Sequence, residues 1–226
     1  MKKLVILTGA GISAESGIST FRDANGLWEN HDIMEVASIE GWNNNPQLVL
    51  DFYNLRRAQL KTVQPNSAHY FLAGLEKNFN VTIITQNVDN LHERAGSTNI
   101  MHLHGQLNKA RSINNDEVFF DSPDIINLGD KAIDGGQLRP HIVWFGEMVP
   151  MMDTAIEATI HADIYIIIGT SLQVYPAASL LDYTKSDAKI ICIDPNDLPI
   201  NNNITYIKKT ATEGVKDLDK ILKDII

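Results

Sequence analysis

Short runs of apolar, β-branched residues recur along the chain and predict buried strands. They occupy residues 4–7, 81–85, 100–103, 164–168, 189–193 and 204–207. Several of these runs are apolar at every position, which is typical of strands buried on both faces of a parallel sheet.

Between these runs, apolar residues spaced three or four apart predict helices at residues 47–61, 67–79, 155–161, 177–183 and 215–226. Strands that alternate with helices predict an α/β fold with a doubly wound, mostly parallel, Rossmann-like sheet. Residues 106–138 differ, because polar and glycine-containing stretches interrupt short apolar groups there. We therefore expect one domain spanning residues 1–226, with residues 106–138 as a small inserted module.

Composition narrows the classes of function. The net charge is −9, and paired basic residues occur without forming a stripe, so we expect no nucleic-acid partner. Cys192 is the only cysteine, which excludes a disulfide within the chain and a cysteine-based metal site and fits a reducing cytoplasm. No apolar run approaches the length of a membrane span, so we expect a cytoplasmic protein with no membrane partner.

A glycine turn follows the first predicted strand. Glycine at positions 9 and 11 removes side chains that would keep a pyrophosphate from the backbone, and a helix starting near Ser13 would direct unpaired N–H groups toward it. Small residues also occur in such turns for packing alone. Further polar or glycine-containing segments follow other strands, at residues 85–89, 104–105, 169–171 and 194–196. Ligands of open α/β sheets bind beyond the carboxyl ends of the strands, so these segments predict one site.

Five motifs occur in one order: G-A-G-I-S at residues 9–13 leading to G-I-S-T-F-R at 17–22, T-Q-N-V-D at 85–89, H-L-H-G at 102–105, R-P-H-I-V-W-F-G-E at 139–147, and G-T-S-L at 169–172. In this order, from the first strand onward, the chain resembles the sirtuin family of NAD-dependent protein lysine deacylases. The resemblance implies that NAD is consumed as a co-substrate, that the substrates are acylated-lysine proteins or peptides, and that nicotinamide and O-acyl-ADP-ribose are released.

The resemblance also implies roles for three catalytic residues. His104 matches the general base that takes a proton from a ribose hydroxyl of NAD, and an imidazole titrating near neutrality suits that role. By spacing alone, His102 and His104 share one face of a strand, and the alternative is that they are packed histidines or a metal pair. Asn87 and Asp89 match the nicotinamide pocket, although Asp89 also stands where a helix-capping residue is common.

The remaining cofactor residues follow the same motifs. Phe21 matches a residue that shields the reactive centre from water, with core packing as the alternative. Gln86 would lie near the ribose, and the hydroxyls of residues 170–171 suit sugar oxygens. The full predicted NAD-binding set is Gly9, Ala10, Gly11, Ser13, Ala14, Thr20, Phe21, Arg22, Trp28, Gln86, Asn87, Val88, Asp89, Gly169, Thr170, Ser171 and Ala211.

Residues 143–147 match the family's substrate strand, whose backbone pairs with an extended peptide; a core strand is the competing interpretation. The predicted substrate residues there are Val143, Phe145, Gly146 and Glu147, with Leu172 and Val174 on the opposing wall. Tyr53 and Arg56 share a helix face and match the Tyr-x-x-Arg pair of the subgroup that prefers succinyl and malonyl groups, because guanidinium and phenol can bind a carboxylate. A solvated arginine beside an interfacial tyrosine is the alternative.

The chain departs from the family at two places. Ser112, Asn115, Lys131 and Asp134 stand where most sirtuins carry four zinc-binding cysteines, so we expect no zinc. We expect the module to be held by packing of Val118, Phe119, Phe120, Ile125, Ile126 and Leu128, with at most a marginal contact between Lys131 and Asp134. Cys192 stands where the family often has an asparagine near the adenosine.

Two other functions remain compatible with these motifs. One is a catalytically weak sensor of NAD or ADP-ribose, and the other is a protein mono-ADP-ribosyltransferase. A Rossmann dehydrogenase fits less well, because no second strand ending in a ribose-binding acid follows the glycine turn.

Overall fold

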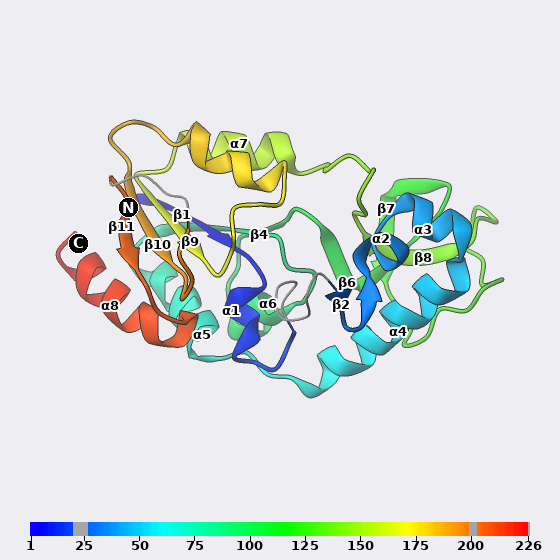
Figure 1. Cartoon of the computed structure of the whole chain (residues 1–226). Helices are drawn as coiled ribbons and strands as arrows, with labels where there is room; N and C mark the ends of the chain where they lie inside the picture. The colour runs from blue at the N-terminus through cyan, green and yellow to red at the C-terminus, as the bar shows by residue number, and fades with distance from the viewer. Residues whose placement is uncertain (20–26, 199–202, 226) are drawn as a thin grey trace.

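The main sheet is the scaffold of the molecule. The structure is a computed structural model that describes residues 1–19, 27–198 and 203–225. Six parallel strands lie in the order β11-β10-β9-β1-β4-β5 (Figure 1). Their bounds are β1 Lys3–Thr8, β4 Asn80–Thr85, β5 Ile100–His102, β9 Ile164–Ile168, β10 Lys189–Ile193 and β11 Thr205–Ile207. The predicted α/β fold with a mostly parallel sheet is confirmed.

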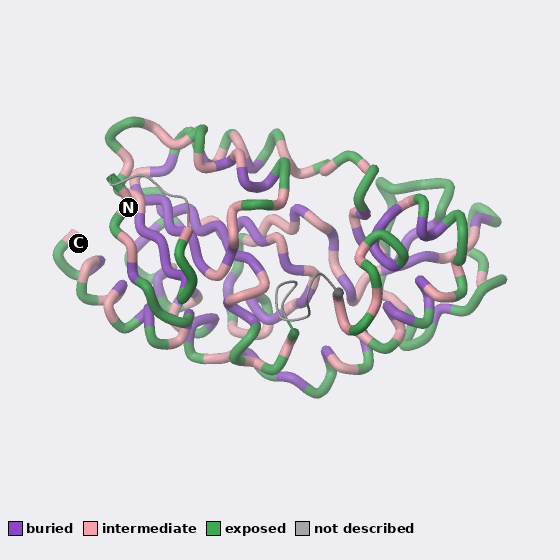
Figure 2. Tube along the Cα trace, viewed as in Figure 1, coloured by how far each residue is buried: buried purple, intermediate pink, exposed green. Residues whose placement is uncertain are grey.

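Alternate residues of each central strand face opposite helical layers. On β1, Leu4 and Ile6 pack in the same cluster as α5 (Ser67–Gly74) and α8 (Ala211–Lys223). Val5 and Leu7 pack in the cluster of α7 (Met152–Ile160) and η2 (Ala177–Tyr183) on the other face. The sheet is buried between the two layers (Figure 2), which explains why its strands are apolar at every position.

Two predicted helices are tighter or shorter than expected. The helix predicted at residues 67–79 ends at Gly74 and continues as the 3₁₀ helix η1 (Leu75–Lys77), and residues 177–183 form a 3₁₀ helix throughout. Apolar spacing of three or four residues does not distinguish α from 3₁₀ geometry, which is the reason for the difference. No helix within the described residues is long and apolar enough to cross a membrane.

A second part of the molecule carries a small antiparallel sheet in the order β7-β6-β8 and several helices (Figure 1). The strands of this sheet are β6 Gly105–Ser112, β7 Asn115–Asp121 and β8 Leu138–Ile142. A hairpin is formed by β2 Leu27–Trp28 and β3 His31–Asp32. The helices are α2 Ile33–Val36, α3 Ile39–Asn44 and α4 Pro46–Thr62. The short helices α1 (Gly11–Ala14) and α6 (Leu91–Ala95) follow β1 and β4. Helix α4 matches the helix predicted at residues 47–61, and the Asn45 side chain caps it by accepting from the Leu48 N–H.

The expected apolar packing within residues 106–138 is wrong. Ile126 is fully buried, but the other five members of the set are each at least 42% exposed: Val118, Phe119, Phe120, Ile125 and Leu128. Val118, Phe119 and Phe120 are exposed because they lie on β7, an edge strand that pairs through its backbone with β6 and whose residues are all exposed.

Polar contacts fasten this segment instead. The Asn54 side chain of α4 makes two 3.0 Å hydrogen bonds with the backbone of Ile126, one as donor and one as acceptor. The Ser112 hydroxyl donates to Asp134 at 2.8 Å, and Asp134 also accepts from the Gly136 N–H at 2.9 Å. These bonds, together with a hydrogen bond of Asp134 to its own backbone, hold the pKa of Asp134 below its ordinary value. Ser112, not Lys131, is therefore the side-chain partner that the structure gives Asp134.

Candidate active site

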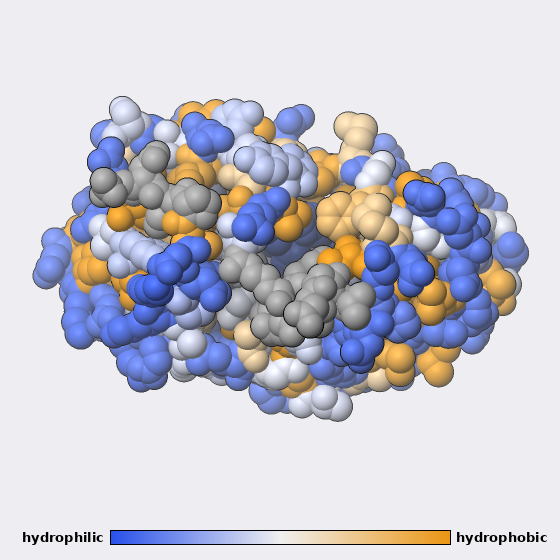
Figure 3. Space-filling view, viewed as in Figure 1, coloured by the Kyte–Doolittle hydropathy of each residue, from blue (hydrophilic) through white to orange (hydrophobic). Residues whose placement is uncertain are grey.

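A cavity of about 690 Å³ lies where the carboxyl ends of the main strands meet the second part of the molecule. The surface is hollowed near the middle of the face in Figure 3. The segments that follow β1, β4, β9 and β10 all contribute to its wall. The parallel strands bring these segments together because their carboxyl ends share one edge of the sheet.

Most of the predicted site residues line this cavity: Gly9, Ala10, Gly11, Ser13, Ala14, Trp28, Tyr53, Arg56, Gln86, Asn87, Val88, Asp89, His104, Val143, Phe145, Gly146, Glu147, Gly169, Thr170, Ser171 and Val174. Leu172 and Ala211 are not among the lining residues and pack into the two clusters that cover the sheet. Thr20, Phe21 and Arg22 lie outside the described residues.

The floor of the cavity is built from three glycines. A Cβ added to Gly9 would lie 2.7 Å from the Gly169 carbonyl oxygen, and one added to Gly11 would lie 2.6 Å from the Gly169 Cα. Gly169 itself has a φ of +64°, and a Cβ there would lie 2.4 Å from the Ile12 nitrogen. The first effect of these glycines is therefore to let the loops after β1 and β9 press together.

The prediction of free N–H groups at this turn needs correction. The helix begins at Gly11, has only four residues, and is too short to carry much dipole. The N–H groups of Gly9 and Gly11 donate to the carbonyls of Ile168 and Gly169, and that of Ser13 donates to Ala10. These donors are satisfied because the turn folds tightly against the end of β9.

His104 stands on the cavity wall immediately before β6. Its Nδ1 lies 3.0 Å from the Gln86 carbonyl oxygen, which can only accept a hydrogen bond. Nδ1 therefore carries the proton and Nε2 keeps its lone pair. Burial lowers the pKa of His104, so the ring is neutral at pH 7. A neutral imidazole fixed in this tautomer is equipped to accept a proton at Nε2.

His102 has different partners. Its Nε2 lies 2.6 Å from Glu93 and its Nδ1 lies 3.3 Å from the Asn87 carbonyl oxygen, and it is not among the cavity-lining residues. The two histidines are thus used separately. Within residues 1–19, 27–198 and 203–225, no three His, Cys, Asp or Glu side chains are grouped to hold a metal ion.

Asn87, Ser13 and Asp89 form a buried polar chain beside His104. The Asn87 amide donates to the Gly9 carbonyl at 3.1 Å and to the Ser13 hydroxyl at 3.2 Å, and this hydroxyl donates to Asp89 at 2.9 Å. The other Asp89 oxygen accepts from the Leu91 N–H at 3.0 Å. Asp89 therefore accepts a hydrogen bond from the first N–H of α6 and also forms part of the cavity wall. Burial raises the pKa of Asp89, although the hydrogen bonds to its carboxylate lower it.

Several lining residues were not predicted, among them Glu15 after β1 and Thr210 after β11. Asn196 belongs to the polar segment 194–196 after β10, which the sequence did place at the site, and it lines the cavity. Cys192, in contrast, is fully buried in the sheet, and burial raises its thiol pKa to about 12.

The expected strand over residues 143–147 is wrong, because β8 ends at Ile142. The Val143 N–H still donates to the His104 carbonyl, and the Phe145 N–H donates to Ala37. Residues 144–147 instead close a turn, with the Glu147 N–H donating to the Trp144 carbonyl at 3.0 Å.

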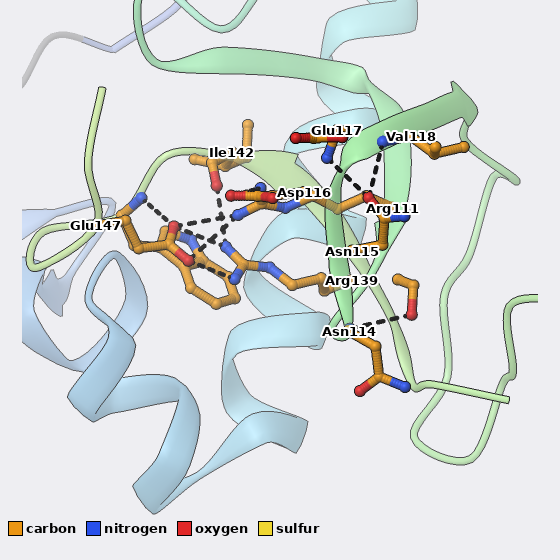
Figure 4. Close-up of polar contacts among 11 residues, drawn as sticks. Arg111, Asn114, Asn115, Asp116, Glu117, Val118, Arg139, Ile142 and Glu147 are labelled. Atoms are coloured by element: carbon orange, nitrogen blue, oxygen red, sulfur yellow. Dashed lines mark hydrogen bonds and ion pairs between the residues drawn. The ribbon is translucent and has the colours of Figure 1, made fainter. Parts of the chain in front are cut away.

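Figure 4 shows what fixes this turn. The Glu147 carboxylate accepts from Arg139 at 2.6 and 3.0 Å, from Arg111 at 3.2 Å and from the Trp144 N–H at 2.8 Å. The Arg139 guanidinium, which is buried, also lies 3.4 Å from the centre of the Trp144 ring. Burial opposes ionisation of Glu147, but the bonds and charge of Arg139 hold its pKa below the ordinary value.

Tyr53 and Arg56 reach the same cavity from α4. The Tyr53 hydroxyl accepts from the Trp144 indole N–H at 3.1 Å, and burial raises its pKa strongly. The Arg56 guanidinium is paired with Glu29 at 2.7 Å. Glu29 was not predicted, because nothing in the spacing of residues 28–30 marks it.

Comparison with known proteins decides the family. The Sir2 family model matches residues 9–176, which is most of the chain. The chain belongs to the Sir2 family. A Sir2-family relative from Helicobacter pylori (strain ATCC 700392 / 26695), named NAD-dependent protein deacylase, is 58% identical over 220 residues, which cover 96% of this chain and 96% of the relative. One of the same name from Bacteroides thetaiotaomicron is 55% identical, over 98% of each chain.

Solved Sir2 structures share the whole architecture. The crystal structure of a Sir2 homologue in complex with NAD superposes with a TM-score of 0.89 at 40% identity, covering 99% of this chain and 90% of that one. A structure of Sir2 with a p53 peptide and NAD⁺ superposes with a TM-score of 0.79 at 31% identity, covering 96% and 92%.

Proposed function

We propose that this Sir2-family chain is an NAD-dependent protein lysine deacylase that releases nicotinamide and O-acyl-ADP-ribose. The observation that carries the proposal is the neutral His104 ring, held by the Gln86 carbonyl on a wall shared with Asn87 and Asp89. The two relatives named above as deacylases, at more than half identity over nearly the full chain, support the same activity.

The residues present fit NAD. The cavity volume is in the range of small-molecule sites, and Gly9, Gly11 and Gly169 line it. The Gln86 amide donates to the Thr170 hydroxyl at 2.9 Å, which joins two strand ends that would hold the ribose side. The rest of the predicted NAD set, apart from residues 20–22 and Ala211, lines the same wall.

When bound, NAD would supply the ribose carbon from which nicotinamide leaves as the acyl oxygen attacks. In our proposal Asn87 and Asp89 hold the nicotinamide carboxamide, as the sirtuin resemblance implies. His104 accepts the proton of a ribose hydroxyl at Nε2, and the Gln86 carbonyl stabilises the resulting imidazolium at Nδ1.

For the acylated-lysine peptide we propose the turn at residues 143–147 and the facing Val174 as the docking site. Four N–H groups of this turn, those of Val143, Trp144, Phe145 and Glu147, already donate within the chain, so the peptide would pair with the remaining backbone groups. The Glu147 carboxylate is fully engaged by Arg139, Arg111 and Trp144, which makes Glu147 a positioning residue for the turn. We further propose residues 106–138 as a small module of the single domain, without zinc.

We also propose a preference for acidic acyl groups such as succinyl and malonyl. Tyr53 and Arg56 line the cavity together, and a guanidinium binds a carboxylate at two points. A purely solvated Arg56 is less consistent with its position, since its side chain is only 18% exposed.

The test follows nicotinamide and lysine products by mass spectrometry, with NAD and matched acetyl-lysine and succinyl-lysine peptides. His104→Ala should lose turnover of both peptides, whereas His161→Ala, at an exposed surface histidine, should not. Arg56→Met should selectively lose succinyl turnover, with Lys61→Met on the same helix as the matched control. Binding of NAD by the wild-type protein without nicotinamide release would overturn the proposal.

A further inference from the structure

Glu29 stands at an unusual position in the backbone. It and Asn30 form the two-residue turn between β2 and β3, whose register pairs Trp28 with His31. Both turn residues have positive φ, +50° for Glu29 and +68° for Asn30. Glycine and asparagine favour this region and glutamate does not. The turn therefore accounts for Asn30 but not for a glutamate at position 29.

The hairpin is fastened to α4, and this directs Glu29 at the cavity. The Trp28 ring packs edge-on against Phe52 and Tyr53, with centroids 4.8 and 6.2 Å apart. The His31 ring meets Phe52 in the same way, 5.5 Å away. Glu29 lines the cavity beside these residues.

The carboxylate of Glu29 forms an ion pair with Arg56, the cation of the pocket. Its Oε1 lies 2.7 Å from Nη1 of Arg56, and the two side chains are 24% and 18% exposed. The Arg56 guanidinium also lies 5.4 Å from the centre of the Phe52 ring, and its Nε is buried with no hydrogen-bond partner among the described residues. Arg56 thus has one carboxylate partner and donor capacity left over.

We propose that Glu29 is a specificity-determining residue that competes with the acyl carboxylate of the substrate for Arg56. This inference rests on the acidic-acyl preference proposed above. A bound acyl carboxylate must displace Glu29 or share the guanidinium with it, so Glu29 weakens binding of acidic acyl groups. With a neutral acyl group, Glu29 keeps Arg56 paired, which avoids burying an unpaired charge. Glu29 therefore lets one pocket accept both acyl classes.

The test measures kcat and KM for matched succinyl-lysine and acetyl-lysine peptides in Glu29→Gln and Glu29→Gly. The glycine variant removes the carboxylate and suits the positive φ, so it controls for disturbance of the turn. Both variants should lower the succinyl KM about three- to fivefold, the upper part of the range for an exposed ion pair, and leave the acetyl KM unchanged or raised. Glu35→Gln, which makes the same charge change at an exposed residue, is the matched control.

The decisive arm repeats the Glu29 variants in an Arg56→Met background, with peptide affinity measured by calorimetry alongside kinetics. There the Glu29 effect should vanish, because the cation it competes for is gone. A succinyl KM that stays within about twofold of wild type in both Glu29 variants, while Arg56→Met still abolishes the succinyl preference, overturns the role of Glu29 alone. Unchanged succinyl turnover in Arg56→Met itself overturns the acidic pocket and the competition with it.

Discussion

Two buried histidines should make the protein lose stability in mild acid. The rings of His69 in α5 and His92 in α6 lie 5.0 Å apart, and the residues are 0% and 1% exposed. The Asn66 N–H donates to His69 Nδ1 at 3.3 Å, and His92 Nε2 lies 3.0 Å from the Thr8 hydroxyl. Burial lowers the pKa of His69 to about 4, and burial with the nearby His69 and His102 lowers that of His92 to about 3.

The magnitude follows from linkage between protonation and folding. Below its ordinary pKa of about 6.5, each histidine binds a proton in the unfolded chain but not in the folded one. The stabilising effect of a neutral ring is complete above that pKa and is lost as the pH falls toward the folded value. Between pH 7.5 and pH 5.0 each ring should cost about 2 kcal/mol of unfolding free energy, or about 4 kcal/mol together.

Urea unfolding followed by circular dichroism at pH 7.5, 6.5 and 5.0 measures this loss. The comparison is a His69→Asn/His92→Gln double variant, in which each amide replaces the hydrogen-bonding ring nitrogen without titrating. Wild type should lose about 4 kcal/mol more than the double variant over this range, while His161→Gln at the surface should follow wild type. Parallel pH curves for wild type and double variant would refute the reasoning.

Three further outcomes are expected. Arg139→Met leaves the Glu147 carboxylate without its main partner, and urea unfolding should show a loss of about 3–5 kcal/mol; a loss near that of a surface pair would contradict a buried network. Ser112→Ala removes the bond to Asp134 and should cost about 1 kcal/mol by the same assay, with no change meaning that the bond does not fasten the segment. The Cys192 thiol, buried and with its pKa raised to about 12, should react with a disulfide reagent only after unfolding, which absorbance of the released thiolate reports; rapid reaction of the native protein would disprove its burial.

The sequence was sufficient to predict the main sheet and the place of the site. Residues 4–7 and 164–168 are apolar throughout because helices cover both faces of the sheet, and that pattern survives in the sequence. The polar segments after these strands converge because the carboxyl ends of parallel strands lie at one edge of the sheet. This follows from the fold class, which the sequence predicts.

Features that depend on contacts between distant segments could not be predicted. Arg111 donates a hydrogen bond to Glu147, which lies 36 positions further along the chain, and no periodic pattern in the sequence marks this pair. The hydrophobicity of Phe119 suggested that it lies in a core, but Phe119 is exposed on an edge strand. The position of a strand within a sheet depends on which strands pair, and the sequence around Phe119 does not show this. Glu29 depends on a turn conformation and on the orientation of α4, neither of which its sequence neighbours encode.

The three interlocking glycines constrain which residues their positions can hold. The space vacated at Gly9, Gly11 and Gly169 is filled largely by backbone of the opposing loop, and backbone cannot be trimmed by a second substitution. A side chain gained at one position therefore has no compensating change at the others. We expect substitutions that change ligand preference to be tolerated in the walls that side chains build, such as the β2–β3 hairpin and α4, and not in this corner of the cavity.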